Sequence, residues 1–307
     1  CNFYMPIFEE ALDAYGLPLE LRYLPIIESA LNPSAVSRAG ASGLWQFMIG
    51  TGKIYGLESN SLVDERRDPI KATWAAARYL KEMYDIYGDW NLVIAAYNCG
   101  PGTINKAIRR ANGETDYWKI YNYLPKETRG YVPAFIAANY VMTYYCDHNI
   151  CPMETDIPAS TDTVQVNKNL HFEQIADLCN VPMDQIKSLN PQYKKQMIPG
   201  DNKPYTLRLP IDAISTFIDK QDTIYAHRAD ELFRNRKTVA VKDITPATRK
   251  ATTAVAGKGN LTYHTIKSGD TLSTIAGKYG VTIKDIQRWN GMSNTKIAAG
   301  KRLKIYK

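Results

Sequence analysis

The chain is predicted to be an α+β multidomain protein, with a mainly α-helical first half followed by small β-α-α-β modules. Three observations predict this class: a length of 307 residues, helical spacing of apolar residues through residues 1–157, and an internal repeat in the second half. One hydrophobic core rarely serves a chain of this length, so several domains are expected. Hydrophobic and charged contents of 45% and 22% are those of a globular protein. Because no uninterrupted apolar run reaches the length of a membrane span, no transmembrane helix is expected.

Helices are predicted in the first half wherever apolar residues recur at intervals of three and four. Asp68 followed by Pro69 is typical of an N-cap and a first helical residue, and Gly16 and Gly88 are typical of helix ends. The last predicted helix is apolar on most sides, so we expect it to be central to the core. The predicted helices cover residues 3–16, 19–31, 69–88, 90–98 and 127–145.

Residues 163–190 and 263–290 are related by a repeat at an offset of 100. Matching pairs include Ile175 with Ile275 and Asn190 with Asn290. In the second copy, alternation in YHTI predicts a strand, TLSTIAGKYG and TIKDIQRWN predict two helices, and RLKIY predicts a closing strand. Each copy is therefore expected to be a short β-α-α-β unit.

These features divide the chain into four predicted segments: a helical domain (1–157), a first module (158–212), a helix with a basic linker (213–260) and a second module (261–307). The net charge of +7 is concentrated in residues 234–258, where seven basic residues stand against Asp243 alone. This segment has few large apolar residues and no interleaved aromatic ones, so it predicts a solvated linker rather than a nucleic-acid tail. Weak attraction to anionic cell-wall polymer or membrane would follow from its charge.

Five cysteines are too few for a disulfide scaffold. Cys146 and Cys151 flank His148, but a metal site needs more ligands, so no metal or other cofactor is expected. The pair forms either a local disulfide, as an oxidising envelope compartment would favour, or two free thiols. Cys1 is either a lipid-bearing cysteine or the start of a trimmed segment, and the helical pattern beginning within a few residues favours the second.

Glu28 lies in the apolar helical run LPIIESAL. If its carboxyl points inward, desolvation raises its pKa and keeps it protonated near neutrality. A protonated carboxyl is what glycosidic bond cleavage requires, because the leaving oxygen must receive a proton. By itself Glu28 does not decide the matter, since most glutamates on amphipathic helices face water.

Three further motifs accompany Glu28-Ser29: Gly43–Phe47 (GLWQF), Ala96–Gly100 (AYNCG) and Tyr131–Pro133 (YVP). Each alone is compatible with core packing or helix capping. Together and in this order they resemble the four motifs of lytic transglycosylases with a goose-type lysozyme fold, over residues 1–157. The resemblance is closest to the membrane-bound D type, in which LysM repeats follow the catalytic domain.

The resemblance implies that Glu28 is the catalytic acid and base, and that the neighbouring motif residues bind or orient the substrate. Gln46 would hydrogen-bond the sugar near the scissile bond, and Tyr131 would steady Glu28. Trp45 and Phe47 are assigned first to structure. The implied substrate-binding residues are Ser29, Gln46, Tyr97, Asn98 and Tyr131.

No second carboxylate occurs in these motifs, so a two-carboxylate hydrolysis is not supported. Asp64, Glu65 and Asp68 are the nearest candidates, but DERRDP is more typical of a charged turn and a helix cap. We expect instead that Glu28 protonates the oxygen between N-acetylmuramic acid and N-acetylglucosamine. It would then take the proton from the C6 hydroxyl, whose oxygen closes on C1 to give 1,6-anhydromuramic acid.

The second module resembles the LysM family through SGDTL (268–272), Ile275-Ala276, Val281 and Asn290. The resemblance implies binding of N-acetylglucosamine-containing glycans in a groove formed by Gly269, Asp270, Thr271, Leu272, Asn290 and Ile297. Asp270 is also a predicted helix cap. The first module has Asn169–Phe172 (NLHF) in place of GDTL, so there the resemblance implies the fold but not sugar binding.

The predicted function is non-hydrolytic cleavage of peptidoglycan by a monomer in the bacterial periplasm or cell envelope. Contact with a membrane is expected only through a lipid on Cys1, as in an outer-membrane lipoprotein. Three alternatives remain: a muramidase that uses water, an inactive wall-binding scaffold, and nucleic-acid binding through residues 234–258, which is not expected.

Overall fold

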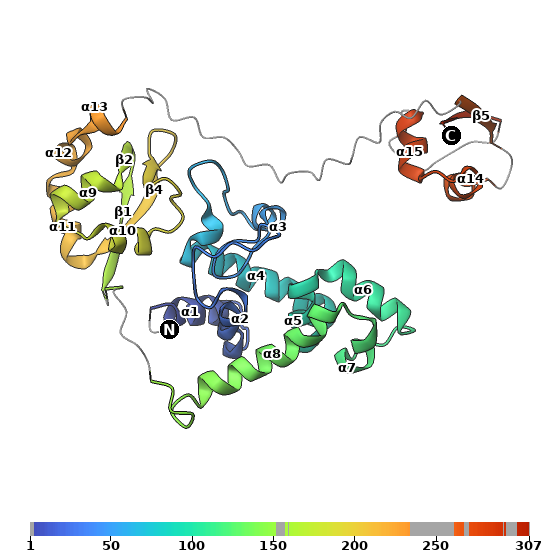
Figure 1. Ribbon diagram of the computed structural model, residues 1–307, viewed down its shortest axis with the longest axis horizontal. Helices are drawn as coiled ribbons and strands as arrows, with labels where there is room; N and C mark the ends of the chain where they lie inside the picture. The colour runs from blue at the N-terminus through green and yellow to red at the C-terminus, as the bar shows by residue number, and fades with distance from the viewer. Residues whose placement is uncertain are drawn as a thin grey trace. The chain divides into compact units, whose positions relative to one another are not determined.

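The computed structural model describes residues 3–151, 157–158, 160–233, 261–266, 270–290, 292 and 300–306. Contacts within the chain divide it into two compact units, residues 1–246 and 247–307, coloured from blue to red in Figure 1. The predicted basic linker, residues 234–258, lies outside the described residues, so the four-segment division stays a prediction. No helix within the described part of the chain is long and apolar enough to cross a membrane.

The first part of unit one is helical, and the predicted helices are present. Asp68 caps α4 by accepting hydrogen bonds from the backbone of Ile70 and Lys71, as predicted. Short 3₁₀ turns cover Leu19–Tyr23, Glu65–Arg67 and Tyr121–Tyr123. The helices are α1 Met5–Ala14, α2 Leu24–Ser29, α3 Ile49–Ile54, α4 Pro69–Tyr87, α5 Trp90–Cys99, α6 Pro101–Arg110, α7 Tyr117–Ile120 and α8 Lys126–Thr143.

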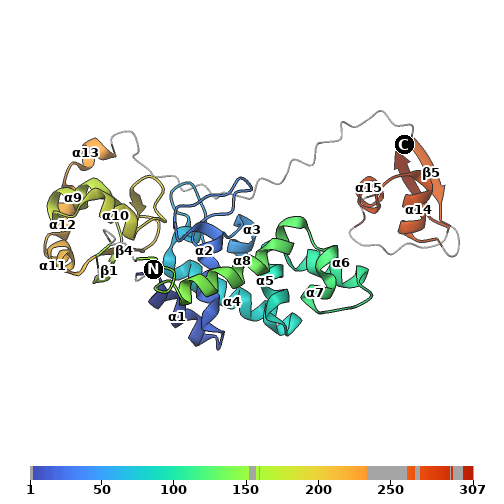
Figure 2. The ribbon, with the colours of Figure 1, turned by 60° about the horizontal axis from the view of Figure 1, so that its bottom comes forward.

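The core of this helical domain lies among α1, α4, α5 and the first half of α8. Figure 2 shows how these helices are arranged. The prediction that the last helix is central to the core is correct only for its first half. Tyr131, Val132 and Phe135 are buried, whereas Ile136 and Tyr140 are 50% and 54% exposed. The first half packs against α2 and α5, and the apolar sequence continues beyond these contacts into solvent.

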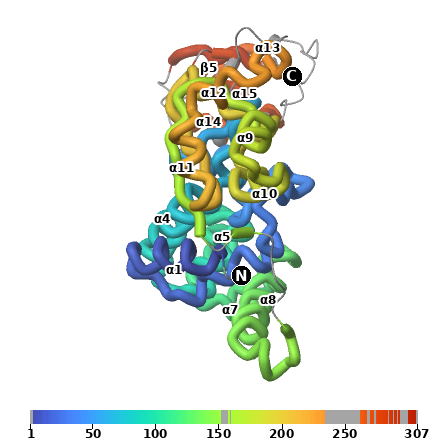
Figure 3. The backbone as a smooth tube through the Cα atoms, turned by 90° about the vertical axis from the view of Figure 1, so that its left-hand side faces the viewer, coloured from blue at the N-terminus to red at the C-terminus, as the bar shows by residue number. Residues whose placement is uncertain are grey.

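The first module follows with its strands in two antiparallel pairs, β1 with β4 and β2 with β3. The later helices α11 and α12 pack against α9, and Phe217 and Ile224 enter the module's core. Figure 3 shows this module beside the helical domain. Its elements are β1 Thr161–Val166, β2 Asn169–His171, α9 Phe172–Cys179, α10 Met183–Leu189, β3 Met197–Pro199, β4 Tyr205–Pro210, α11 Ile211–Asp219, α12 Gln221–Ala226 and α13 Ala229–Leu232.

The second module, in unit two, has the predicted β-α-α-β order. Strands β5 (Leu261–Thr265) and β6 (Arg302–Tyr306) pair antiparallel, with α14 (Leu272–Tyr279) and α15 (Ile283–Trp289) between them in the chain. Its small core contains Leu272, Ile275, Ile286 and Leu303. With the helical domain and these strand pairs, the mixed α+β class is confirmed.

Candidate active site

The position of Glu28 is set by where α2 begins and ends. Pro25 occupies the first turn of the helix, where a missing N–H carries no penalty. The helix stops directly after Glu28-Ser29, because Ala30 and Leu31 both have left-handed backbone angles, φ 51° and 60°. Non-glycine residues adopt this conformation only where surrounding contacts enforce it, and such strain concentrates at functional sites. Glu28 is therefore held at a fixed helix end rather than along a continuous helix.

The carboxyl group of Glu28 is withdrawn from water and bonded to a tyrosine. Burial raises its pKa to about 7, the hydrogen bond donated by the Tyr131 hydroxyl to Oε1 opposes this rise, and the charge of Glu127 adds to it. None of the ion pairs within the described residues involves Glu28. The group can therefore hold a proton near neutrality, as expected from its apolar neighbours in the sequence.

The backbone of the motif Gly43–Phe47 is hydrogen-bonded to Ser29, the neighbour of Glu28, and to Tyr97. The Ser29 hydroxyl donates toward Leu44 O at 2.9 Å, and the Tyr97 hydroxyl donates to Trp45 O at 2.7 Å. Burial raises the pKa of the Tyr97 hydroxyl well above its usual range, and the nearby Glu28 charge adds to the rise. Ser29 and Tyr97 thus fix the distance between α2, α5 and this loop, so they orient the site.

Gln46 and Asn98 are the predicted sugar-contacting residues of the motifs Gly43–Phe47 and Ala96–Gly100. Gln46 has a left-handed backbone, φ 47°, and its Nε2 donates to Gly43 O at 2.8 Å. Asn98 lies in the last turn of α5 and accepts a hydrogen bond from the Thr128 hydroxyl on α8 at 2.8 Å. Trp45 and Phe47 are 0% and 3% exposed, so their assignment to structure is confirmed.

The alternative carboxylates of DERRDP serve the fold. Asp64 pairs with Arg66 at 2.8 Å, and Glu65 pairs with Lys71 at 2.5 Å. Asp68 is the cap of α4. The interpretation of this segment as a turn and a cap is confirmed, although Asp64 and Glu65 are buried rather than solvated.

Sequence reasoning missed Glu127, an exposed carboxylate whose charge raises the pKa of Glu28. It precedes Tyr131 by four residues on α8, so both side chains lie on one face of the helix. That spacing is the signal that could have found it. Of the predicted site residues, the structure brings Glu28 and Tyr131 into direct contact, and Ser29 and Tyr97 join them through the Gly43–Phe47 backbone.

The helix-cap prediction for Asp270 in the second module is wrong. The N-cap of α14 is Thr271, which accepts from Thr274 N at 3.2 Å, and Asp270 instead lies 2.9 Å from His264 Nε2. Leu272 is 2% exposed, so its side chain belongs to the module's core. Gly269 and Ile297 lie outside the described residues.

Asn290 has a structural role, because its side-chain amide joins the second helix to the last strand, and its predicted role in glycan binding stays a prediction. Its Nδ2 donates to Ile286 O and Lys304 O at 2.8 and 2.9 Å, and its Oδ1 accepts from Lys304 N at 2.7 Å. Asn190 makes the same three contacts in the first module, with Ile186 O, Arg208 O and Arg208 N. The repeat therefore preserves a clamp between the second helix and the last strand.

Cys146 and Cys151 are not bonded to each other in this structure, and their pairing in an oxidising compartment stays a prediction. Cys146 and Cys151 are exposed free thiols, and Cys1 lies outside the described residues. In the described part of the chain, no three His, Cys, Asp or Glu side chains gather in a way that could hold a metal ion.

Comparisons with known proteins give the class of the chain. Residues 5–120 match the transglycosylase SLT domain family, residues 160–226 match the LysM-like domain of the lytic transglycosylase MltD, and residues 264–305 match the LysM domain. The chain therefore carries a transglycosylase SLT domain followed by two LysM-type domains.

Within this class, the chain is 32% identical over 294 residues to the membrane-bound lytic murein transglycosylase D of Escherichia coli K12. The match covers 94% of this chain and 60% of that protein. The soluble lytic murein transglycosylase of the same strain is 33% identical over 124 residues, covering 38% of this chain and 19% of its own length. The crystal structure of a 70 kDa soluble lytic transglycosylase from Escherichia coli aligns with a TM-score of 0.41 and 29% identity, over 47% of this chain and 24% of that one.

Proposed function

We propose that the protein is a lytic transglycosylase that cleaves the β-1,4 bond between N-acetylmuramic acid and N-acetylglucosamine in peptidoglycan. The observation that carries the proposal is Glu28, a desolvated carboxyl with a pKa of about 7 and a tyrosine partner. Similarity to a transglycosylase along most of the chain supports the same reaction. A peptidoglycan substrate implies a location in the periplasm or cell envelope, and a lipid on Cys1 would attach the protein to a membrane.

In this mechanism Glu28 acts twice. Protonated Glu28 gives its proton to the glycosidic oxygen, and the bond from that oxygen to C1 of muramic acid breaks. The resulting carboxylate takes the proton of the C6 hydroxyl, and the C6 oxygen bonds to C1. The product carries a 1,6-anhydromuramic acid end, no water is consumed, and Glu28 is again protonated. General acid–base help of this kind is worth about 10²–10⁴-fold in rate.

The other residues of the site hold this geometry. Tyr131 keeps Oε1 of Glu28 in one orientation through its hydroxyl. Ser29 and Tyr97 hold the Gly43–Phe47 loop, from which Gln46 would contact the sugar beside the scissile bond. Asn98, fixed by Thr128, would contact an N-acetyl group. The LysM domains would raise the local concentration of glycan near the cleft.

Mass spectrometry of the products tests the proposal on purified peptidoglycan. The comparison uses the wild type, Glu28→Gln, and Glu10→Gln as an exposed control on α1. We expect anhydromuropeptides from the wild type and the control and none from Glu28→Gln. If the wild type releases no product, the proposal is refuted and the protein is a wall-binding module instead.

A hydrolytic muramidase is the second candidate, because Glu127 brings another carboxylate close enough to influence Glu28. Such a group could activate a water molecule. The same experiment separates the two reactions, since hydrolysis adds one water to each product. Products of this mass that disappear with Glu127→Gln would favour the muramidase.

A further inference from the structure

The first module grips a loop of the helical domain, residues 58–67. Val63 and Tyr193 form an antiparallel bridge, with Asp64 N donating to Gln192 O at 2.9 Å and Lys194 N donating to Leu62 O at 2.8 Å. Leu62 and Val63 are 3% and 0% exposed and belong to the core of the module. The loop is thus built into both domains at once.

From this contact a network of charged side chains, buried at Asp64 and Arg66, extends into the helical domain. Lys194 Nζ donates to Asn60 O at 2.8 Å and lies 3.6 Å from Asp64 Oδ2. Asp64 in turn accepts two hydrogen bonds from Arg66, from Nε at 2.9 Å and from Nη2 at 2.8 Å. The Asp64 and Arg66 side chains are 2% and 5% exposed, and two parallel bonds fix the plane of the guanidinium.

Arg66 connects this network of charged side chains to the loop that contains Gln46. Its Nη1 donates to Gly40 O at 2.8 Å and to Phe47 O at 2.9 Å, one on each side of Gln46 in the sequence. Its backbone oxygen lies so close to Gly43 that a Cβ there would come within 1.7 Å of it. The Gln46 loop, residues 40–47, is therefore shaped around Arg66 from both the side chain and the backbone.

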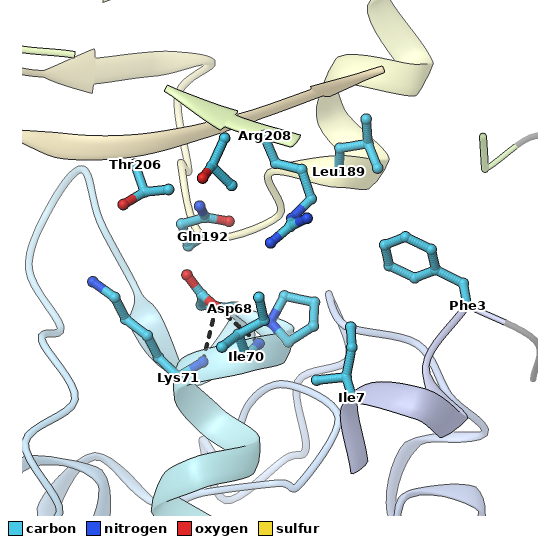
Figure 4. A pocket seen from close by; sticks show the side chains of 11 residues that line it. Phe3, Ile7, Asp68, Ile70, Lys71, Leu189, Gln192, Thr206 and Arg208 are labelled. Carbon is cyan, nitrogen blue, oxygen red and sulfur yellow. Dashed lines mark hydrogen bonds between the residues drawn. The ribbon is translucent and has the colours of Figure 1, made fainter. Parts of the chain in front are cut away.

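The remainder of the contact between the domains is less tightly filled. A cavity of about 200 Å³ lies between the start of α4 and the module. Figure 4 shows Asp68 and Lys71 on one side of this cavity and Gln192 and Arg208 on the other. Since packing does not close the interface on this side, the bonds of residues 58–67 carry more of the docking.

We propose that Lys194 of the first module, acting through Asp64 and Arg66, positions the Gln46 loop relative to Glu28. The first module then contributes to cleavage as a brace and not as a sugar-binding domain. Displacement of Arg66 would release Phe47 O and Gly40 O and allow Gln46 to move, while Ser29 and Tyr97 still hold Leu44 and Trp45. The proposal rests on the proposed transglycosylase function for its catalytic consequence, but the structural coupling can be measured without activity.

The test compares Lys194→Met, which keeps an unbranched side chain one atom shorter but removes its charge and donors, with Lys195→Met as the matched exposed control. We expect the turnover number of Lys194→Met to fall about tenfold with little change in KM, because a displaced loop spoils alignment more than binding. Lys194→Arg, which restores charge and donors, should recover most of the rate.

Amide hydrogen exchange in the Gln46 loop is the second measurement, because it would not change if Lys194 had only a local role in the first module. The amides of Ser42 and Gly43, bonded to Phe47 O and Ala35 O, should exchange faster in Lys194→Met while those of α9 do not change. If exchange at these amides matches the Lys195→Met control, the coupling is refuted. If Lys194→Met does not fold, the milder Lys194→Gln decides by the same measurement. A wild type that leaves peptidoglycan intact would refute the proposed function, but the exchange comparison would still decide the coupling.

Discussion

Two carboxyl groups of the helical domain, Glu28 and Asp64, are both withdrawn from water but have opposite electrostatic surroundings. At Glu28, burial raises the pKa to about 7, and the Tyr131 hydroxyl is its only hydrogen-bond partner among the described residues. At Asp64, burial acts in the same direction, but the hydrogen bonds and charge of Arg66, with the charge of Lys194, outweigh it and lower the pKa. Desolvation by itself therefore does not distinguish a proton donor from a structural anchor, whereas the presence of a buried cation does.

The largest expected effect is loss of activity in Glu28→Gln. The amide keeps the shape of the side chain but carries no transferable proton, so cleavage should fall by about 10³-fold. The free energy of unfolding at pH 8 should not fall. The folded-state pKa of Glu28 is raised, so its contribution to stability is fully present only below its unfolded value and is lost as the pH rises through about 7.

Denaturant unfolding at pH 8 and product analysis on the same samples check both halves of this prediction. A loss of stability in Glu28→Gln would indicate that the carboxylate is a structural anchor after all. The contrast with Asp64 would then disappear.

Asp64→Asn is expected to have the opposite effect on stability from Glu28→Gln. It leaves the Arg66 guanidinium buried without its counter-charge, which should lower the free energy of unfolding by about 3 kcal/mol. Because the pKa of Asp64 is lowered in the fold, the stabilisation by wild-type Asp64 is present above its unfolded value and is lost as the pH falls through its folded value. Urea unfolding between pH 7 and strongly acidic pH measures this, with Asp219→Asn as an exposed control. Equal stability of the two variants at pH 7 would contradict it.

The local chemistry of the site was accessible from the sequence, because helix caps, apolar spacing and motif order are short-range signals. LPIIESAL predicted a desolvated Glu28, and Asp68-Pro69 predicted the start of α4. The α-helical domain and the β-α-α-β order of the second module followed from periodicity and the repeat, whereas the first module has an additional strand pair, β2 with β3.

Contacts between segments far apart in sequence could not be predicted in this way. DERRDP predicts a charged turn and a helix cap, but nothing in it indicates that Asp64 is buried against residues of a module more than a hundred positions later in the chain. Its charges mark a solvated surface or a buried network equally well, and only the partner decides which. For Asn290, the shared position in both modules fitted a sugar ligand as well as the structural clamp that is observed.

A smaller effect is expected from Tyr131→Phe, which removes the hydrogen bond that the Tyr131 hydroxyl donates to Glu28. Hydrogen bonds to charged groups are worth about 1.5–3 kcal/mol, so the rate should fall by roughly 10- to 100-fold. In the wild type the rate should decline as the pH rises through about 7, because Glu28 must enter the reaction protonated. Since the Tyr131 bond lowers the pKa of Glu28, this alkaline limb should move to higher pH in the variant. A pH–rate profile that keeps its alkaline limb in place would show that Glu28 does not set it.

Glu127→Gln should give the smallest effect and the opposite sign. Its negative charge raises the pKa of Glu28, so neutralising it should move the alkaline limb of the pH–rate profile to lower pH while the rate at acidic pH changes little. Glu127 is exposed, so salt should screen the interaction and the displacement should shrink as ionic strength increases. Tyr131→Phe should move the alkaline limb to higher pH and Glu127→Gln should move it to lower pH. Together the two variants test whether the Glu28 carboxyl alone controls the pH–rate profile. If Glu127→Gln instead abolished cleavage at every pH, Glu127 would be a second catalytic carboxylate, and the reaction would need to be assigned to hydrolysis.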